Sequence, residues 1–180
     1  MTVVAAATAL LDAYLPSPGD EAVIAEFAEL LETERPAARA QFTPGHLTAS
    51  GFVLSPDRSA LLLIHHRRLR RWLQPGGHID EGDPAPLAAA RREVDEETGV
   101  ADLTELVAGL IGLNRHPIPE RHDEPAHHHF DLQFAFIASS WHLEQRVEVI
   151  EARWVPLGEV PALAGDAAVQ RALMRLSALP

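Results

Sequence analysis

Residues 75–100, PGGHIDEGDPAPLAAARREVDEETGV, join a pair of glycines to one segment with clear helix limits. Asp83 is a favourable N-cap, Pro84 suits the first helical position, and Gly99 suits the left-handed residue just past a helix. The apolar residues of the segment recur on one stripe, which should face a sheet. The pattern therefore predicts one helix over residues 84–98, entered through a tight glycine turn.

Three glutamates crowd the end of this predicted helix. Glu93, Glu96 and Glu97 lie at i, i+3 and i+4, so their side chains share one face. Each pair of like charges costs a few tenths of a kcal/mol, and the helix dipole disfavours anions at this end. Arg91 and Arg92 offset only part of that repulsion. The cluster is either a solvated helix end or a set of oxygen ligands for a hard divalent cation.

The same stretch resembles the Nudix box, G-x5-E-x7-R-E-U-x-E-E-x-G-U, in which U is a bulky aliphatic residue. Gly77 fits the first position. The residues that fit the second half, without a gap, are Arg92, Glu93, Val94, Glu96, Glu97, Gly99 and Val100. Asp83 stands where the box has Glu, and eight residues instead of seven separate it from Arg92. We therefore expect Asp83 to serve mainly as the helix cap.

The resemblance implies a fold, a reaction and a site. Nudix proteins hydrolyse a nucleoside diphosphate linked to another group, use Mg²⁺ or Mn²⁺, and have an α/β/α sandwich with a mixed sheet. Carried over by residue, Glu93, Glu96 and Glu97 are catalytic metal ligands, Gly77 supplies a backbone ligand or shapes the loop, and Arg92 orients a box carboxylate. Such hydrolysis depends on cations that neutralise phosphate oxygens and lower the pKa of the attacking water.

The rest of the chain predicts a mixed α/β protein. Residues 1–45 are expected to form a helical extension packed on the main domain, and residues 46–180 to form the Nudix domain. Asp20 is the expected N-cap of the second helix of that extension. The expected strands cover 48–56, 60–66, part of 103–114, 128–139 and 152–157. Residues 115–127, rich in proline and charge, are expected to form a loop that sets specificity over 115–126.

Composition excludes several classes of function. The formal net charge of −11 disfavours bulk nucleic acid and anionic membranes as partners, whereas a small nucleotide or diphosphate is allowed where arginines and bound cations reverse the local field. The absence of cysteine excludes thiolate metal sites, and it speaks against an isoprenoid-diphosphate isomerase, whose relatives use a cysteine proton donor. The first 20 residues fail the signal-peptide pattern, so a cytoplasmic protein is expected. The oligomeric state stays open, with a homodimer among the alternatives.

Polar residues outside the box supply further candidates. His127, His129 and Asp131 alternate on the strand face opposite the phenylalanines, where they can contact substrate, offer further metal ligands or simply be solvated. Arg71 ends a dense basic run, which either binds the phosphates of the substrate or forms a solvated hairpin.

The general base is expected among three glutamates that precede the strand RWVPL. Glu151 is the catalytic candidate, with Glu148 beside it; surface glutamates, Glu144 among them, are the alternative interpretation. A second hypothesis for the whole chain is a non-catalytic Nudix domain that binds a nucleotide and acts as a sensor. The intact Glu93, Glu96 and Glu97 speak against it.

Overall fold

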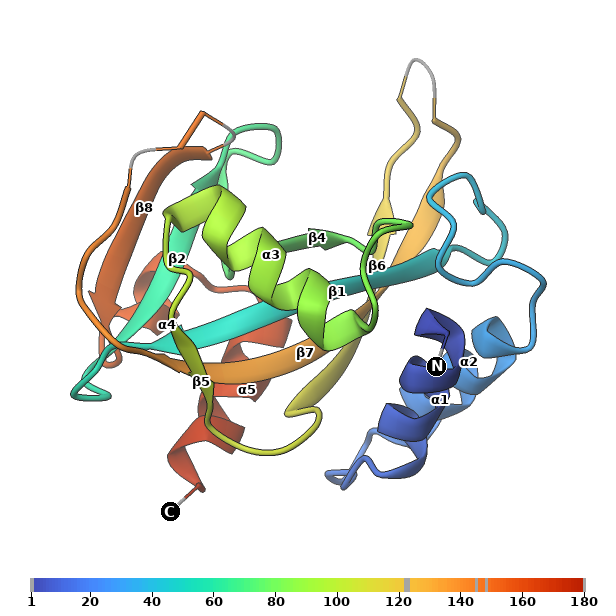
Figure 1. Cartoon of the computed structure of the whole chain (residues 1–180), viewed down its shortest axis with the longest axis horizontal. Helices are drawn as coiled ribbons and strands as arrows, with labels where there is room; N and C mark the ends of the chain where they lie inside the picture. Colours follow the sequence, from blue (N-terminus) through green and yellow to red (C-terminus); the bar gives the residue numbers. More distant parts are fainter. Residues whose placement is uncertain (1, 122–123, 145, 148, 180) are drawn as a thin grey trace.

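A curled mixed sheet lies between helical layers (Figure 1). The computed structural model describes residues 2–121, 124–144, 146–147 and 149–179. The strands in these ranges are β1 (His46–Leu54), β2 (Ala60–His66), β3 (Arg71–Leu73), β4 (Gly76–His78), β5 (Leu103–Glu105), β6 (Gly112–Ile118), β7 (His127–Ala138) and β8 (Val149–Pro156). The helices are α1 (Val3–Asp12), α2 (Glu21–Leu31), α3 (Pro86–Thr98), α4 (Val160–Leu163) and α5 (Ala167–Ser177). None of the described helices is long and apolar enough to cross a membrane.

The parallel pair of β1 and β7 forms the centre of the sheet. The main strand order is β3-β2-β1-β7-β5, while β4 pairs with β1, β6 with β7 and β8 with β2. His46 lies opposite His129, Thr48 opposite Asp131 and Ser50 opposite Gln133. Because side chains alternate along a strand, these polar residues share one face of the two strands. The register therefore gathers polar groups that are far apart in sequence.

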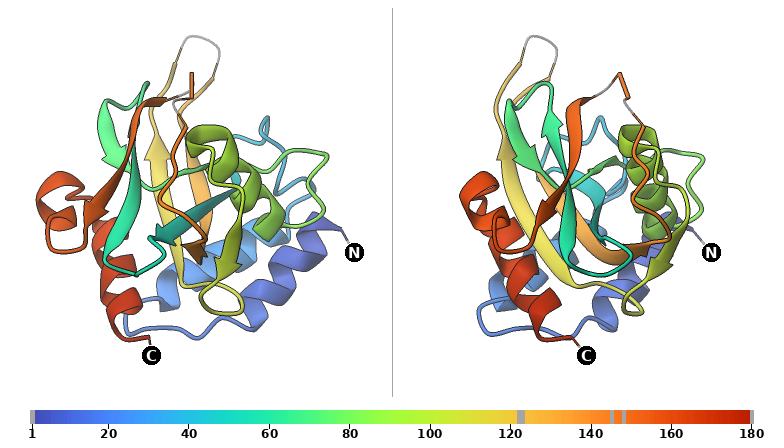
Figure 2. Two further views of the ribbon diagram at one scale, coloured as in Figure 1. Left: turned by 60° about the vertical axis from the view of Figure 1, so that its left-hand side comes forward. Right: turned by 90° about the vertical axis from the view of Figure 1, so that its left-hand side faces the viewer.

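Two apolar cores cover the two faces of the sheet. In Figure 2, α3 and α5 lie on opposite sides of it. Ala90 and Val94 of α3 join the first core, and Val169 and Ala172 of α5 join the second. This is the α/β/α arrangement expected from the sequence, with strands and helices layered as predicted.

The N-terminal helices α1 and α2 pack against the first core. Phe27 of α2 meets Phe130 of β7 edge-on, with ring centroids 5.3 Å apart. Asp20 is the N-cap residue of α2, as predicted, but its side chain makes no capping hydrogen bond to the helix. Its carboxylate instead accepts hydrogen bonds from the Tyr14 hydroxyl and the Ser17 N–H and pairs with Arg175 of α5. A buried carboxylate is better compensated by a guanidinium than by amide groups at a helix end.

Two boundaries near the site differ from those predicted. α3 begins at Pro86 with Ala85 as N-cap, because the carboxylate of Asp83 binds Arg92 and not the helix end. Gly99 is left-handed with φ of 75°, as predicted. The segment expected as a loop from residue 115 continues β6 as far as Ile118, in a hairpin with β7. An edge strand tolerates the proline and the charges that indicated a loop.

Candidate functional site

The glycine turn lies directly against the glutamates of α3. The backbone N–H of Gly76 donates to Oε2 of Glu97 at 2.9 Å, and Glu97 is only 5% exposed. A Cβ added to Gly77 would lie 2.6–2.7 Å from the carboxylate atoms of Glu93, closer than any real Cβ contact. A side chain at position 77 would therefore displace the Glu93 carboxylate, which glycine leaves in place. The turn and the helix end form one unit, here named the carboxylate cluster: Glu93, Glu96 and Glu97.

Arg92 holds the surroundings of this cluster in place. Its Nε and Nη2 atoms donate to the two carboxylate oxygens of Asp83 at 3.1 and 2.9 Å. Its Nη1 donates to Glu93 and to Glu96, both at 2.9 Å, and Nη2 also reaches the carbonyl of His78 at 2.8 Å. The expected orienting role of Arg92 therefore has a geometric basis. Asp83 is its bidentate partner and not the helix cap that the sequence predicted.

The carboxylate cluster carries more negative charge than Arg92 can balance. Burial raises the pKa of Glu93 to about 7, against the opposing effect of Arg92. Burial acts on Asp83 in the same direction, but hydrogen bonds from Arg92 and from the Asp80 N–H outweigh it and lower the pKa of Asp83. A group of carboxylates short of positive charge fits a hard divalent cation with oxygen ligands, such as Mg²⁺ or Mn²⁺.

The carboxylate cluster opens into a cavity of about 520 Å³. All three glutamates, Gly76 and Gly77 line it. The cavity also receives cationic side chains from four separate positions: Arg39, Arg67, Arg68 and Arg121. Carboxylates and guanidinium groups around one cavity can bind a metal ion and an anionic group side by side.

Asp131 lies on the wall of this cavity and is fully enclosed by polar partners. It accepts hydrogen bonds from Ser50 Oγ at 2.6 Å, Thr48 Oγ1 at 3.3 Å and Gln133 Nε2 at 3.3 Å. Burial raises its pKa above the usual range for a carboxyl. The structure thus places the predicted Asp131 at the cavity, with its hydrogen-bonding capacity largely used by the sheet.

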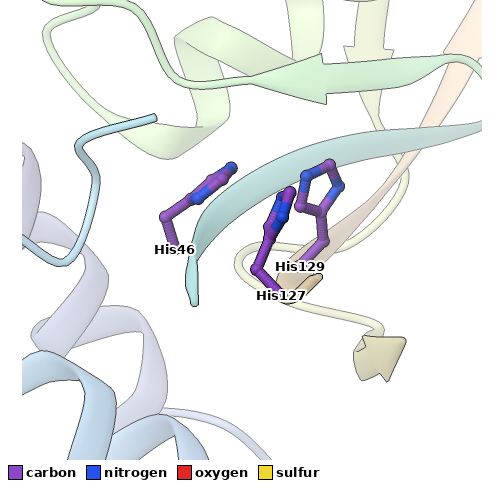
Figure 3. A group of neighbouring side chains, drawn as sticks. All are labelled: His46, His127 and His129. Carbon is purple, nitrogen blue, oxygen red and sulfur yellow. The ribbon is translucent and has the colours of Figure 1, made fainter. Parts of the chain in front are cut away.

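Five histidine rings gather beside Asp131. This histidine cluster comprises His46, His78, His116, His127 and His129, whose neighbouring ring centroids lie 4.8–5.4 Å apart. Figure 3 shows three of them, at the adjoining ends of β1 and β7. Burial lowers the pKa of His78 to about 4 and that of His129 to about 2, so both rings are neutral at physiological pH. Neutral rings are poor phosphate ligands but good metal ligands.

A model of the NUDIX domain family matches residues 44–176. The chain belongs to the NUDIX family. The resemblance seen in the sequence is therefore confirmed, and the carboxylate cluster with Gly77 and Arg92 occupies the Nudix box of this member.

Two curated relatives match short segments of this Nudix protein. The 8-oxo-(d)GTP phosphatase of Mycolicibacterium smegmatis is 37% identical over 65 residues, which cover 36% of this chain and 19% of that protein. The RNA pyrophosphohydrolase of Erythrobacter litoralis is 43% identical over 63 residues, 34% of each chain. The matched segments thus span about a third or less of these relatives.

Solved structures share the fold over a longer range. The crystal structure of a NUDIX-family hydrolase from Clostridium perfringens aligns with a TM-score of 0.59 at 20% identity, covering 75% of this chain and 98% of the other. At that identity the likeness shows the fold alone. It confirms the predicted mixed sheet with flanking helices.

Three of the predicted site residues, Arg71, Glu151 and His127, lie outside the Nudix cavity. Arg71 forms an ion pair with Asp166 at 3.6 Å, while its neighbours Arg67 and Arg68 line the cavity. Glu151 is half-exposed on β8, opposite His65, and lies 3.7 Å from Arg153. Among the other glutamates considered as a base, Glu144 is exposed and pairs with Arg146. Glu148 lies outside the described residues.

Of the histidine cluster, the sequence predicted only His127 and His129 as site residues. His46 enters through the parallel register that sets it opposite His129, and His116 through the β6–β7 hairpin. Neither pairing leaves a local signal, because parallel strands are joined by long connections and the hairpin was read as a loop. The high histidine count was the available hint.

Proposed function

We propose that this protein is a metal-dependent hydrolase that cleaves the diphosphate linkage of a nucleotide or of a nucleoside-diphosphate-linked compound. One observation carries the proposal: Glu93, Glu96 and Glu97, tied to the glycine turn and to Arg92, face a cavity that also receives several arginines. The residues present fit Mg²⁺ or Mn²⁺, which the three glutamates would hold with the backbone at Gly77 beside them.

Each part of the box has a separate task in this proposal. A bound divalent ion would neutralise phosphate oxygens and lower the pKa of the attacking water. Arg92 orients Glu93 and Glu96 through hydrogen bonds of 2.9 Å, and the Gly76 N–H orients Glu97. Holding these carboxylates in place before substrate arrives avoids reorganisation during the reaction.

Substrate contacts are proposed for the remaining walls of the cavity. Arg68 would bind phosphate oxygens, with Arg67 contributing its remaining Nη1 because its Nε and Nη2 donate to the carbonyls of Val147 and Val149. Asp131 would accept or donate a hydrogen bond to the rest of the substrate. Two relatives are named for 8-oxo-(d)GTP and for RNA. The net charge of −11 favours a small nucleotide over a long polyanion, because the summed field repels extended phosphate chains.

A substrate screen tests the proposal. Purified protein is offered nucleoside triphosphates, dinucleoside polyphosphates, nucleotide sugars and ADP-ribose with Mg²⁺ or Mn²⁺, and phosphate and nucleotide products are measured. We expect cleavage of at least one class by the wild type, its loss in Glu97→Gln, and its retention in Asp95→Asn. Asp95 is a suitable control because it lies on the same helix and pairs with Arg146, away from the cavity. Nucleotide binding without turnover of any class would instead support a sensor domain.

A further inference from the structure

Three rings of the histidine cluster bring their nitrogen atoms together. One ring nitrogen from each of His46, His127 and His129 lies within 4.8 Å of the other two. His46 begins β1, and the other two stand at the start of β7, with His46 directly opposite His129 in the parallel register. Figure 3 shows the three rings converging on one space beside β1. We name this set the histidine triplet.

The second observation is a nitrogen left without a partner. His46 is 1% exposed, and its Nε2 has no hydrogen-bond partner among the described residues. A buried polar atom without a partner is unfavourable, so a native structure that keeps one needs a reason. An ion bound by this nitrogen would provide that reason.

Backbone carbonyls decide which nitrogen of each ring is available. Nδ1 of His46 lies 3.1 Å from the carbonyl oxygen of Gln41, and Nδ1 of His127 lies 2.8 Å from that of Pro125. A carbonyl only accepts, so both rings carry their proton on Nδ1 and keep a lone pair on Nε2. Metal-binding histidines are oriented in this way, with the outer N–H held by a carbonyl or a carboxylate.

We propose that His46, His127 and His129 bind a divalent transition ion, with Zn²⁺ as the first candidate, at a site separate from the carboxylate cluster. Three imidazoles with no carboxylate among them favour zinc and its neighbours over Mg²⁺, which prefers oxygen. The site goes beyond the proposed hydrolysis, which needs only the glutamates.

Binding requires a modest contraction of the triplet. Nitrogen ligands at a Zn–N distance of about 2.0–2.1 Å in a tetrahedral site lie about 3.3–3.4 Å apart. The rings must therefore approach by roughly 1.5 Å at most from their 4.8 Å limit, which small side-chain rotations supply. His78 is a candidate fourth ligand, with its ring centroid 5.2 Å from that of His46 and 5.0 Å from that of His129. Water is the alternative.

Cobalt spectroscopy on metal-stripped protein tests the site. The purification tag must be removed, because polyhistidine binds the same ions. Co²⁺ should give the visible bands of a tetrahedral nitrogen site, which Co²⁺ bound to the oxygen ligands of the carboxylate cluster would not give, and Zn²⁺ should abolish them. His127→Ala and His129→Ala should each weaken Co²⁺ binding at least 10²-fold. His142→Ala, which removes an exposed histidine, and Glu97→Gln should leave the bands unchanged.

The result that overturns the site is equally direct. Absence of tetrahedral bands in the wild type, or unaltered bands in folded His127→Ala and His129→Ala, contradicts it. Circular dichroism establishes folding of each variant. If a variant does not fold, NMR of the wild type decides: Zn²⁺ should shift the ring signals of His46, His127 and His129 and leave that of His142 in place. Because Glu97→Gln removes hydrolysis but not the cobalt bands, the two proposals fail separately.

Discussion

The carboxylate cluster lines the cavity and the histidine triplet reaches it through His129, but the charges and polar atoms of the two groups are compensated in opposite ways. The glutamates share a charged partner, Arg92, which donates to two of them and to Asp83. Within the described part of the chain, the Nδ1 atoms of His46 and His127 have backbone carbonyls as partners. The carboxylate cluster is anionic, offers oxygen ligands and has its charge partly balanced by Arg92. The histidine triplet is neutral and offers nitrogen ligands.

The contrast shows that burial shifts the pKa of a carboxyl group and that of an imidazole in opposite directions. Burial raises the pKa of Glu93 to about 7, so the cluster gains stability from any added cation. Burial lowers the pKa of His129 to about 2, which keeps that ring neutral and its lone pair free. The two groups should therefore select different ions from one solution, Mg²⁺ at the glutamates and Zn²⁺ at the histidines.

Removing one box carboxylate should have the largest effect. Glu97→Gln keeps an acceptor for the Gly76 N–H, so the fold should survive, but it removes a charged metal ligand. We expect kcat to fall on the order of 10³-fold, as for loss of a major electrostatic contribution. Steady-state kinetics with saturating Mg²⁺ measure this. Wild-type turnover in Glu97→Gln would show that the carboxylate cluster is not the catalytic metal site.

A methyl group at the glycine turn should disturb the same cluster without changing its charge. In Gly77→Ala the new Cβ would lie 2.6 Å from a carboxylate oxygen of Glu93, so that carboxylate must move. We expect kcat to fall roughly 10–10²-fold, because misplacement of a site group by about 1 Å has costs of this size. Gly82→Ala is the matched control, since nothing lies within 4 Å of its added Cβ. Equal rates in the two variants would contradict the proposed contact.

Loss of the Asp83–Arg92 pair should reduce stability. Asp83→Asn should lower the free energy of unfolding by about 1–3 kcal/mol at neutral pH, because Arg92 loses a buried charged partner. The folded pKa of Asp83 lies below its unfolded value of about 3.9. The stabilisation is therefore complete above that value and is lost as the pH falls through the folded pKa.

Urea unfolding at neutral and at acidic pH measures this difference. Asp80→Asn is the control. Asp80 is 69% exposed and its ion pair with Arg92 is long, at 3.6 Å, so its loss should change the free energy of unfolding little. A difference between wild type and Asp83→Asn that persists unchanged in acid would rule out the ionised pair as its source.

Zn²⁺ binding should give the smallest effect, an increase in stability that depends on the histidine triplet. At ten times its Kd, Zn²⁺ adds about 1.4 kcal/mol to the stability of metal-stripped protein. For a domain of this size that corresponds to roughly 3–6 °C in Tm. Differential scanning calorimetry should show this shift in the wild type and in Glu97→Gln, but not in His127→Ala. A shift of equal size in all three proteins would place the ion elsewhere.

The sequence predicted the carboxylate cluster well because that site is local. Glu93, Glu96 and Glu97 fall on one helix face by the 3.6-residue period, and Gly99 ends that helix as expected. The role of Asp83 was predicted wrongly, because an aspartate just before a helix can either cap the helix or pair with an arginine, and the sequence is the same in both cases. Only the position of Arg92 in space distinguishes the two.

The histidine triplet was predicted in part, since it depends on contacts between distant segments. His127 and His129 were recognised by alternation along one strand. His46 joins them only through the parallel pairing of β1 with β7, which no short-range pattern reveals. Glu151 as general base and Arg71 as substrate contact stay predictions; both side chains lie outside the cavity lining.

The central claim is that the carboxylate cluster supports hydrolysis of a diphosphate through a bound divalent ion. Its most direct test is the initial rate of cleavage of the best substrate from the screen, measured against Mg²⁺ concentration after chelation. The account predicts no cleavage in the chelated protein, saturable recovery with Mg²⁺, and no recovery in Glu97→Gln. Full cleavage in the presence of the chelator, or equal recovery in Glu97→Gln, would contradict it.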